Sequence, residues 1–358
     1  MINRNIYKFS AAVFGLGISA ICLAACNNLP ATSKETKPKP KTAVIDTAKP
    51  KSIDTVPVIV RLPVDTAKYN RLLRYLAHDQ PNARWPVKGT PYPLPGAILP
   101  FKRVVAFYGN FYSKRMGILG ELPPQQMLQK LKEECKKWAK ADSLTPVIPA
   151  LHYIVVSAQH EPGKGNRYNL RMPFKQIDKA LALAKQVNGI VFLDIQVGQS
   201  TLEQEIPKLE PYLKLDNVHL AIDPEFSMKG GHLPGSRIGT FDAQEINYAS
   251  GYLAKLVRKY NLTPKIFIVH RFTMKMVTNY KNIKTRPEVQ FVMDMDGWGF
   301  QAKKIDTYDM CERNNPVQFT GFKLFYKNDI KTPGFSKFIM TPQEVLKLFP
   351  KPVYIQYQ

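Results

Sequence analysis

The sequence is poor in cysteine, in tryptophan and in acidic residues. Of its 358 residues four are cysteine and three are tryptophan, and 28 Asp and Glu stand against 51 Lys and Arg. The cysteines form no CxxC motif and the histidines form neither HxH nor HExxH, so the common zinc-binding patterns are absent. No GxGxxG or P-loop motif follows an apolar run either. We therefore expect no metal site and no cofactor.

The first 25 residues predict a secretory signal. Arg4 and Lys8 form a short basic region, and an uncharged apolar stretch covers residues 9–25. This stretch is shorter than the about 20 residues that a membrane-spanning helix needs. No other uncharged apolar run approaches that length, so we expect the remainder of the chain to lie outside the bilayer.

The run LAAC at positions 23–26 ends this apolar stretch. Small residues before a cut suit a peptidase pocket, and the sulfur of Cys26 can accept a diacylglycerol. The run resembles the lipobox of bacterial lipoproteins, which implies cleavage before Cys26, palmitate-type lipidation of that residue and a cell-envelope location. Asn27 supplies no acidic sorting signal, which favours the outer membrane, at the periplasmic or the cell surface. The alternative is an ordinary signal peptide that contains a cysteine.

The charge of the remaining chain favours anionic partners. Without residues 1–25 there are 49 basic and 28 acidic residues, a net charge of +21. The lysines are scattered and no Arg-rich run alternates with aromatic residues, so we expect an anionic glycan or envelope polymer and no nucleic acid. Loose adhesion to an anionic envelope is the simpler interpretation of the same charge. We expect a monomer.

Composition divides the chain into four parts. Residues 1–25 are the signal, and residues 26–60 are a Lys- and Pro-rich tether without aromatic residues. Residues 61–100 contain a helix capped by Asp65, with Tyr69, Leu72, Leu73 and Leu76 on one face, and a Pro-rich connector. Residues 101–358 are close to the ~250 residues of a (β/α)8 barrel.

Alternating strands and helices predict the fold of residues 101–358. Short apolar runs predict strands at 103–109, 147–156, 189–196, 218–225, 265–271, 289–296, 319–326 and 352–357. Helices are expected at 124–141, 174–187, 202–213, 300–313, and from capping boxes at Asp242 and Thr341. This pattern indicates an α/β fold with a parallel sheet, closed as a (β/α)8 TIM-type barrel. An open doubly wound sheet is the runner-up.

Cysteine positions fit this assignment. Cys135 and Cys311 are the cysteines left after the signal and the lipidated residue, and an exported protein can pair cysteines. The barrel assignment places them on helices that are not neighbours. We therefore expect two free, largely buried thiols.

Polar residues occupy the inward positions at the carboxyl ends of the predicted strands, where barrel active sites lie. The inward set is Tyr108, Asn110, His152, Asp194, Gln196, Asp223, Glu225, His270, Asp294, Asp296, Lys323 and Gln356, with Trp298 just beyond. Buried charges at this density indicate a functional site. The alternative is a structural network, with Lys323 paired to Asp294 or His270 to Asp194.

The sequence Asp223-Pro224-Glu225 carries the sharpest chemical signal. An i, i+2 pair on a strand places both carboxyls on one face, where one can hold a proton while the other stays ionised. Glycosidic cleavage needs such a pair. We assign Glu225 as the general acid and Asp223 or Asp194 as base or nucleophile. Supporting roles fall to Asp294, Asp296 and His270, and ligand contacts to Lys323, Tyr108, Asn110, Gln196, Trp298, His152 and Tyr326.

Two long loops follow the second and fourth predicted strands. Residues 157–173 contain Lys164, Arg167 and Arg171, and residues 226–241 contain four glycines, His232 and Arg237. Such loops suit a lid over an anionic ligand, and equally a solvated surface.

Several runs carry a resemblance to known proteins. GIVFLDIQVG, LAIDPEF, VHRFT, DMDGWG and GFKLFY resemble segments of a group of exported bacterial proteins. Over residues 101–358 the architecture resembles the (β/α)8 glycoside hydrolases, which implies catalytic glutamates ending strands four and seven. Glu225 fits strand four, but strand seven carries Lys323. The DxxDxDxE pattern of chitinase-like enzymes is absent, because Asp223 and Glu225 alone occur there.

Two other functions remain open. In a metal-assisted phosphodiesterase, a hard divalent ion would be held by Asp194, Asp223, Glu225, Asp294 and His270. In a non-catalytic lipoprotein, the barrel would bind a glycan or another partner.

Overall fold

Eight parallel strands form a closed ring in the computed structural model, which describes residues 61–81, 84–332 and 337–358. The ring consists of β1 (Arg103–Gly109), β2 (Val147–Ala158), β4 (Ile190–Ile195), β5 (Val218–Ile222), β7 (Lys265–Arg271), β9 (Val289–Met295), β10 (Phe319–Leu324) and β11 (Tyr354–Tyr357). β1 pairs in parallel with both β2 and β11, which closes the sheet. The predicted (β/α)8 barrel is confirmed. The predicted signal, lipidation site and tether lie outside the described residues.

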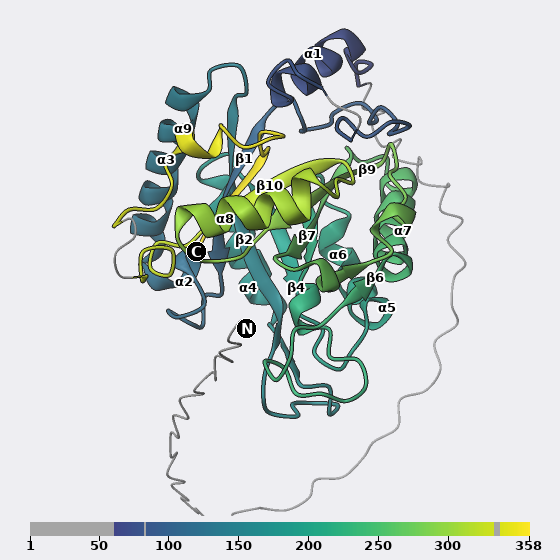
Figure 1. Ribbon diagram of the computed structural model, residues 1–358. Helices are drawn as coiled ribbons and strands as arrows, with labels where there is room; N and C mark the ends of the chain where they lie inside the picture. Colours follow the sequence, from purple (N-terminus) through teal and green to yellow (C-terminus); the bar gives the residue numbers. More distant parts are fainter. Residues whose placement is uncertain (1–60, 82–83, 333–336) are drawn as a thin grey trace, which may run out of the picture. The chain divides into compact units, whose positions relative to one another are not determined.

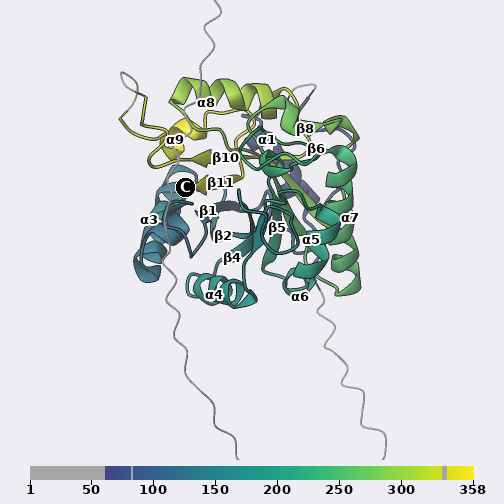
Figure 2. The ribbon, with the colours of Figure 1, turned by 90° about the horizontal axis from the view of Figure 1, so that it is seen from below.

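Helices surround the ring, as the view along the barrel shows (Figure 2). They are α2 (Ile118–Glu121), α3 (Pro124–Ala141), α4 (Phe174–Lys185), α5 (Leu202–Glu205), α6 (Glu210–Leu213), α7 (Ala243–Lys259), α8 (Gln301–Tyr308) and α9 (Pro342–Val345). Short 3-10 turns are η1 (Ile206–Leu209), η2 (Pro224–Phe226), η3 (Met274–Met276) and η4 (Tyr280–Asn282), and η5 (Asp309–Arg313) is a π-helical extension of α8.

Local sequence explains where these helices begin and break. The predicted capping boxes are present at Asp242 for α7 and at Thr341 for α9. The predicted helix over 202–213 is broken into α5, η1 and α6, because Pro207 and Pro211 cannot donate backbone hydrogen bonds. The segment between β7 and β9 contains η3, η4 and the two-residue strand β8 (Val277–Thr278).

Three short strands lie outside the ring. β3 (Asn169–Arg171) pairs antiparallel with the end of β2, and β6 (Phe241–Asp242) pairs with β8 (Val277–Thr278). β3 and the start of β6 fall in the segments predicted as loops 157–173 and 226–241. The sequence gives little signal for them, because strands this short have no measurable alternation.

Side chains alternate between two apolar layers, as the barrel predicts. Outward residues such as Val191, Leu193 and Ile195 pack against the helices, whereas Phe192 and Ile190 point into the ring. Cys135 on α3 is half-buried and Cys311 on η5 is buried, and both are free thiols, as predicted.

The N-terminal end of the ring is closed by the chain that precedes β1. α1 (Thr66–Leu76), capped by Asp65 as predicted, lies at this end, and the long loops after β2 and β5 lie at the other end (Figure 1). Trp85 donates its indole N–H to the Gln318 carbonyl at 2.7 Å. The Gln290 side chain accepts from the backbone of Leu99 at 3.1 Å. The open end of the barrel is therefore the carboxyl end of its strands.

No helix of the described residues is both long enough and apolar enough to cross a membrane.

Candidate active site

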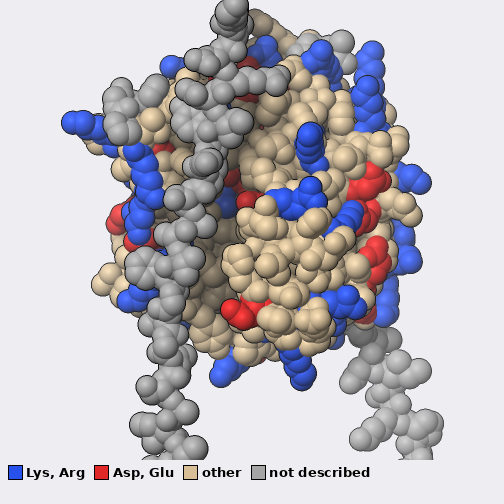
Figure 3. All heavy atoms as spheres, turned by 60° about the horizontal axis from the view of Figure 1, so that its bottom comes forward, with Lys and Arg blue, Asp and Glu red and all other residues tan. Residues whose placement is uncertain are grey.

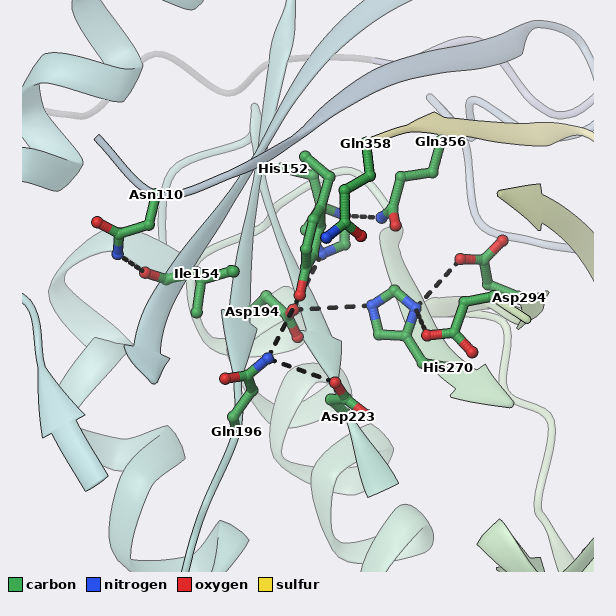
Figure 4. Close-up of polar contacts among 12 residues, drawn as sticks. Asn110, His152, Ile154, Asp194, Gln196, Asp223, His270, Asp294, Gln356 and Gln358 are labelled. Carbon is green, nitrogen blue, oxygen red and sulfur yellow. Dashed lines mark hydrogen bonds and ion pairs between the residues drawn. The ribbon is translucent and has the colours of Figure 1, made fainter. Parts of the chain in front are cut away.

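The predicted inward residues meet at the open end of the barrel. Figure 4 shows the His270 ring between Asp194 on one side and Asp294 on the other, with His152, Gln196 and Asp223 around them. These side chains come from β2, β4, β5, β7 and β9 or from the residues directly after them. The sequence therefore identified the side chains that share this space.

His270 lies among three carboxylates. Its Nδ1 is 3.1 Å from Asp294 Oδ2 and 3.5 Å from Asp296 Oδ2, and its Nε2 is 3.7 Å from Asp194 Oδ2. Burial alone would lower the pKa of this imidazole, but the hydrogen bond to Asp294 and the three negative charges raise the pKa to about 9. His270 is thus a buried positive charge at neutral pH, and its ion pair with Asp194, which the structural alternative named, is present.

His152 has the opposite character. Its ring stacks on Phe192 with centroids 5.4 Å apart, and its Nδ1 is 2.5 Å from the Tyr354 hydroxyl. Gln356 Nε2 lies 3.1 Å from the same nitrogen. Burial lowers the pKa of His152 to about 4, despite the nearby Asp194 carboxylate. The two imidazoles therefore carry different charges at neutral pH.

Asp194 is enclosed between these rings. His152 Nε2 is 3.6 Å from Asp194 Oδ2, which is longer than a hydrogen bond. Burial opposes ionisation of Asp194, but the adjacent His152 and the charge of His270 together lower its pKa. Asp194 is fully buried, so it acts on its neighbours rather than on a ligand at the surface.

Asp223 turns the chain after β5. The predicted strand over 218–225 included Asp223, and this is wrong. The Oδ1 atom of Asp223 accepts the Glu225 N–H at 3.0 Å and caps η2 instead. Its Oδ2 is 3.5 Å from Gln196 Nε2, which also donates to the Tyr108 hydroxyl at 3.4 Å. Burial and the charge of Glu225 raise the pKa of Asp223 well above its usual range. Ionisation of Asp223 is therefore disfavoured.

Glu225 titrates near neutrality. Its side chain is half-buried, and burial together with the negative charge of Asp296 raises its pKa to about 7. Lys323 and His270 oppose this rise. The pKa of Asp296 is also raised by burial, against the charges of His270 and Lys323. The pKa of Asp194 is therefore lowered, whereas the pKa values of Asp223, Glu225 and Asp296 are raised.

Lys323 lies over an aromatic ring. Its Nζ is 3.8 Å from the centre of the Tyr108 ring, a cation–π contact. The predicted ion pair between Lys323 and Asp294 is not among the ion pairs of the described residues. The Tyr108 ring also contacts His152 and His270, with centroids 5.1 and 6.0 Å away. Tyr108 is therefore a central member of the site, as predicted.

Two residues of the site were missed by the sequence interpretation. Tyr354 contacts His152 as described above. Gly321 is the register partner of Asp294, which in turn pairs with His270. A Cβ at Gly321 would lie 2.5 Å from Asp294 Oδ1. The missing side chain at position 321 thus makes room for the carboxylate, and a glycine within an apolar strand was the available signal.

Other predicted ligand contacts lie at the edge of the site or outside it. Asn110 donates to the Ile154 carbonyl and accepts from a backbone N–H, so it holds the loop after β1. Tyr326 points outward, because β10 ends at Leu324; it stacks on Tyr357 at 5.3 Å. Trp298 is 47% exposed at the rim.

The basic loop residues differ in how they are engaged. Arg171 donates twice to the buried Glu205, each time at 2.5 Å, so it is a structural residue and not a ligand contact. Arg167 is exposed and contacts the Gln199 carbonyl at 3.4 Å. Arg237 lies 2.5 Å from the His232 ring.

The ligand set expected for the phosphodiesterase does not form one metal site. Among the described residues, the group whose ligand atoms all lie within 4.8 Å of one another is His152, Asp194 and His270. Asp223, Glu225 and Asp294 are outside this group, and His152 is an addition to the expected set.

The surface over the site is hollowed. Figure 3 looks toward this end and shows a recess with acidic and basic side chains in it. A cavity of about 300 Å³ opens at the carboxyl ends of β1, β10 and β11. Its lining includes Lys114, Arg115, Lys327 and Lys331, together with Phe325 and with Glu121, which pairs with Lys327 at 2.6 Å. The carboxyls of the candidate site do not line this cavity. The open end of the barrel thus combines buried carboxyls with a basic rim.

Comparisons with known proteins find only distant similarity. No protein-family model and no curated protein sequence matches the chain. Among solved structures, the chain is similar to a ruminal endo-β-1,4-mannanase of glycoside hydrolase family 26, with 10% identity and a TM-score of 0.33. That match covers 72% of this chain and 59% of the mannanase. A Bacillus subtilis mannanase matches at 11% identity and a TM-score of 0.37, over 82% of this chain and 86% of that one. Burkholderia cenocepacia dihydropteroate synthase matches at 9% identity and a TM-score of 0.30, over 75% of this chain and 88% of that one. Values this low carry no inference about activity.

Proposed function

We propose that this chain is an exported lipoprotein, attached through Cys26, whose barrel hydrolyses glycosidic bonds in an anionic envelope or environmental polysaccharide. One observation carries the catalytic part of this proposal. Glu225, at the open end of the barrel, is half-buried and has a pKa of about 7. A carboxyl that keeps its proton near neutral pH is what the departing oxygen of a sugar requires.

Glu225 is the general acid in this mechanism. Its protonated carboxyl donates to the glycosidic oxygen as the bond to the anomeric carbon breaks, and the leaving sugar departs as an alcohol. Burial and the charge of Asp296 keep the proton on Glu225 until it is transferred. Loss of the proton then makes Glu225 a carboxylate, which can accept a proton from water.

Asp296 is the best candidate for the second carboxylate. It follows β9 at the open end, and its charge has the largest effect on Glu225 of all neighbouring charges. The two residues favoured from the sequence are less suited. Asp194 is fully buried between two imidazoles, and the carboxylate of Asp223 is engaged in capping the turn that carries Glu225. Asp296 would act as base, nucleophile or stabiliser of the oxocarbenium ion.

The rim of the barrel supports an anionic glycan as the substrate. Lys114, Arg115 and Lys331 line the cavity at the ends of β1, β10 and β11, and a carboxylate- or sulfate-bearing sugar would neutralise them, whereas Lys327 is paired with Glu121. Trp298 offers an exposed aromatic face for a sugar ring. Leu233 and Ile238, in the loop after η2, are also exposed apolar side chains on this side.

The test is turnover of a polysaccharide panel by the full chain in detergent. The panel pairs uronic-acid polymers with neutral polymers of the same linkage, and new reducing ends are measured. Glu225→Gln is expected to lose about 10²- to 10⁴-fold in kcat, because general acid catalysis contributes that much. Glu203→Gln, an exposed glutamate on α5, is the matched control and is expected to retain activity.

Two outcomes contradict the proposal. Equal turnover by wild type and Glu225→Gln removes Glu225 from the chemistry. Tight binding to one polymer, with no reducing ends released by wild type, identifies a glycan-binding protein on a barrel scaffold instead.

A further inference from the structure

Four polar atoms at the centre of the site face one another without hydrogen-bond partners. They are Nε2 of His152, Nε2 of His270 and both carboxylate oxygens of Asp194. All three side chains are fully buried, and none of these atoms makes a hydrogen bond to the described residues. Buried polar groups in proteins are nearly always hydrogen-bonded, so a group of four unpaired atoms calls for an additional ligand.

The spacing of these atoms suits a metal ion. Ligand atoms about 2.1 Å from one ion, at tetrahedral or octahedral angles, lie about 3.0 to 3.5 Å apart. Asp194 Oδ2 is 3.6 Å from His152 Nε2 and 3.7 Å from His270 Nε2, and the three ligand atoms all lie within 4.8 Å of one another. A contraction of a few tenths of an ångström, which ligation itself supplies, brings both oxygen–nitrogen distances into this range.

The outer nitrogens of both imidazoles are already oriented. Asp294 Oδ2, 3.1 Å from Nδ1 of His270, accepts its N–H and directs Nε2 toward Asp194. The Tyr354 oxygen, 2.5 Å from Nδ1 of His152, can accept that N–H in the same way. Gln356 donates to the Tyr354 hydroxyl at 2.8 Å and fixes its position. Such outer hydrogen bonds are typical of metal-bound histidines.

We propose that His152, Asp194 and His270 bind a divalent first-row transition ion, with Zn²⁺ as the representative. The ion takes the place of the proton on Nε2 of His270, which is released to solvent on binding. Two imidazole nitrogens and one carboxylate favour ions of this class over Mg²⁺ or Ca²⁺, which prefer oxygen ligands alone. Asp296 and Asp294 add negative charge beside the cation. Three protein ligands leave at least one coordination position for water.

This inference does not rest on the proposed glycosidase activity, and its test measures binding. Purified full chain without an affinity tag is treated with a chelator, desalted and titrated with Co²⁺ and with Zn²⁺. One equivalent of Co²⁺ is expected to produce visible d–d absorption bands, and Zn²⁺ is expected to displace it. Metal analysis after desalting is expected to find one Zn²⁺ per chain.

Variants assign the site. His152→Ala and His270→Ala are expected to lose stoichiometric binding, whereas His160→Ala, an exposed loop histidine, is expected to bind like wild type. Asp294→Asn, which weakens the orientation of His270, is expected to lower affinity about 10- to 100-fold. Circular dichroism verifies that each variant is folded.

Three results overturn the proposal. The absence of absorption bands and of a retained ion in wild type shows that water fills the space. Equal binding by wild type, His152→Ala and His270→Ala places the ion elsewhere on the chain. If both alanine variants fail to fold, an unchanged affinity in Asp294→Asn decides against the site.

Discussion

Replacing Gly321 by alanine tests whether the arrangement around His270 depends on space left in β10. The new Cβ would lie 2.5 Å from Asp294 Oδ1 and 2.9 Å from Tyr354 Cδ1. Neither neighbour can move freely, because Asp294 accepts from His270 and Tyr354 contacts His152. A contact this short has to be relieved by a shift of the strand or of both side chains.

The expected cost follows from this geometry. An extra methyl group in a closely packed core lowers the free energy of unfolding by about 1 to 3 kcal/mol. Because Asp294 and Tyr354 cannot move freely, we expect Gly321→Ala to cost about 2 kcal/mol. Urea unfolding followed by fluorescence measures the change. Gly251→Ala on α7 is the matched control: its nearest neighbour would be 3.5 Å away, so it is expected to stabilise the helix by about 0.5 to 1 kcal/mol.

A double-mutant cycle identifies the carboxylate as the source of the cost. In an Asp294→Ala background the 2.5 Å contact is gone and the Tyr354 contact remains. Gly321→Ala should then cost at least about 0.5 kcal/mol less than in wild type. The packing explanation would be refuted if the free energy of unfolding of Gly321→Ala lay within about 0.5 kcal/mol of wild type while Gly251→Ala behaved as expected.

Three further predictions use other parts of the molecule. The pKa of Glu225 is about 7 in the folded chain and 4.5 ordinarily, so the stability it contributes is present below about pH 4.5 and is lost as the pH rises toward 7. Glu225→Gln should therefore gain unfolding free energy relative to wild type at pH 8 and gain none at pH 4; an equal difference at both would contradict the shift. Arg171→Gln leaves the buried Glu205 without its main partner and should lower the unfolding free energy by about 2 to 3 kcal/mol, whereas Arg167→Gln should change it little. Because the pKa of Glu205 is lowered, this loss should shrink as the pH falls below its usual range; thermal scans at two pH values measure it. Cys26→Ser should abolish labelling by radioactive palmitate and release the protein from membranes, and retained label would reject lipidation at that residue.

The fold could be predicted because its strands are buried on both faces. Such strands appear as short apolar runs, and the runs at 103–109 and 265–271 match β1 and β7 at both ends. The predicted strand over 218–225 is too long, because the run of residue types does not show that Asp223 turns the chain. Strand ends depend on such local hydrogen bonds, which an alternation pattern does not contain.

The sequence could predict which residues face the inside of the barrel, but not how deeply each side chain is buried. Alternation places His152, Asp194 and Asp223 inside the ring, and the structure confirms this. It does not tell how far each side chain reaches along the barrel. For that reason the expected base was Asp194, which is fully enclosed, and His152 was not expected among possible metal ligands.

Distances across the ring could not be predicted either. The orientation of His152 depends on Tyr354, which lies on a strand 202 residues away in the sequence. Tyr326 was expected near the ligand because the seventh predicted strand extended to it, but β10 ends two residues earlier and the side chain faces α3.

The closed end of the barrel is also where the described part of the chain begins. Arg61, at the start of the described chain, donates to the Asn261 carbonyl at 2.8 Å and pairs with Asp216 at 3.6 Å. Asn261 and Asp216 lie in turns that precede strands, at the end of the barrel opposite the carboxyl groups of the candidate site. The described chain therefore begins at the end of the barrel opposite the candidate site. A long polymer bound across the carboxyl ends of the strands would not meet Arg61.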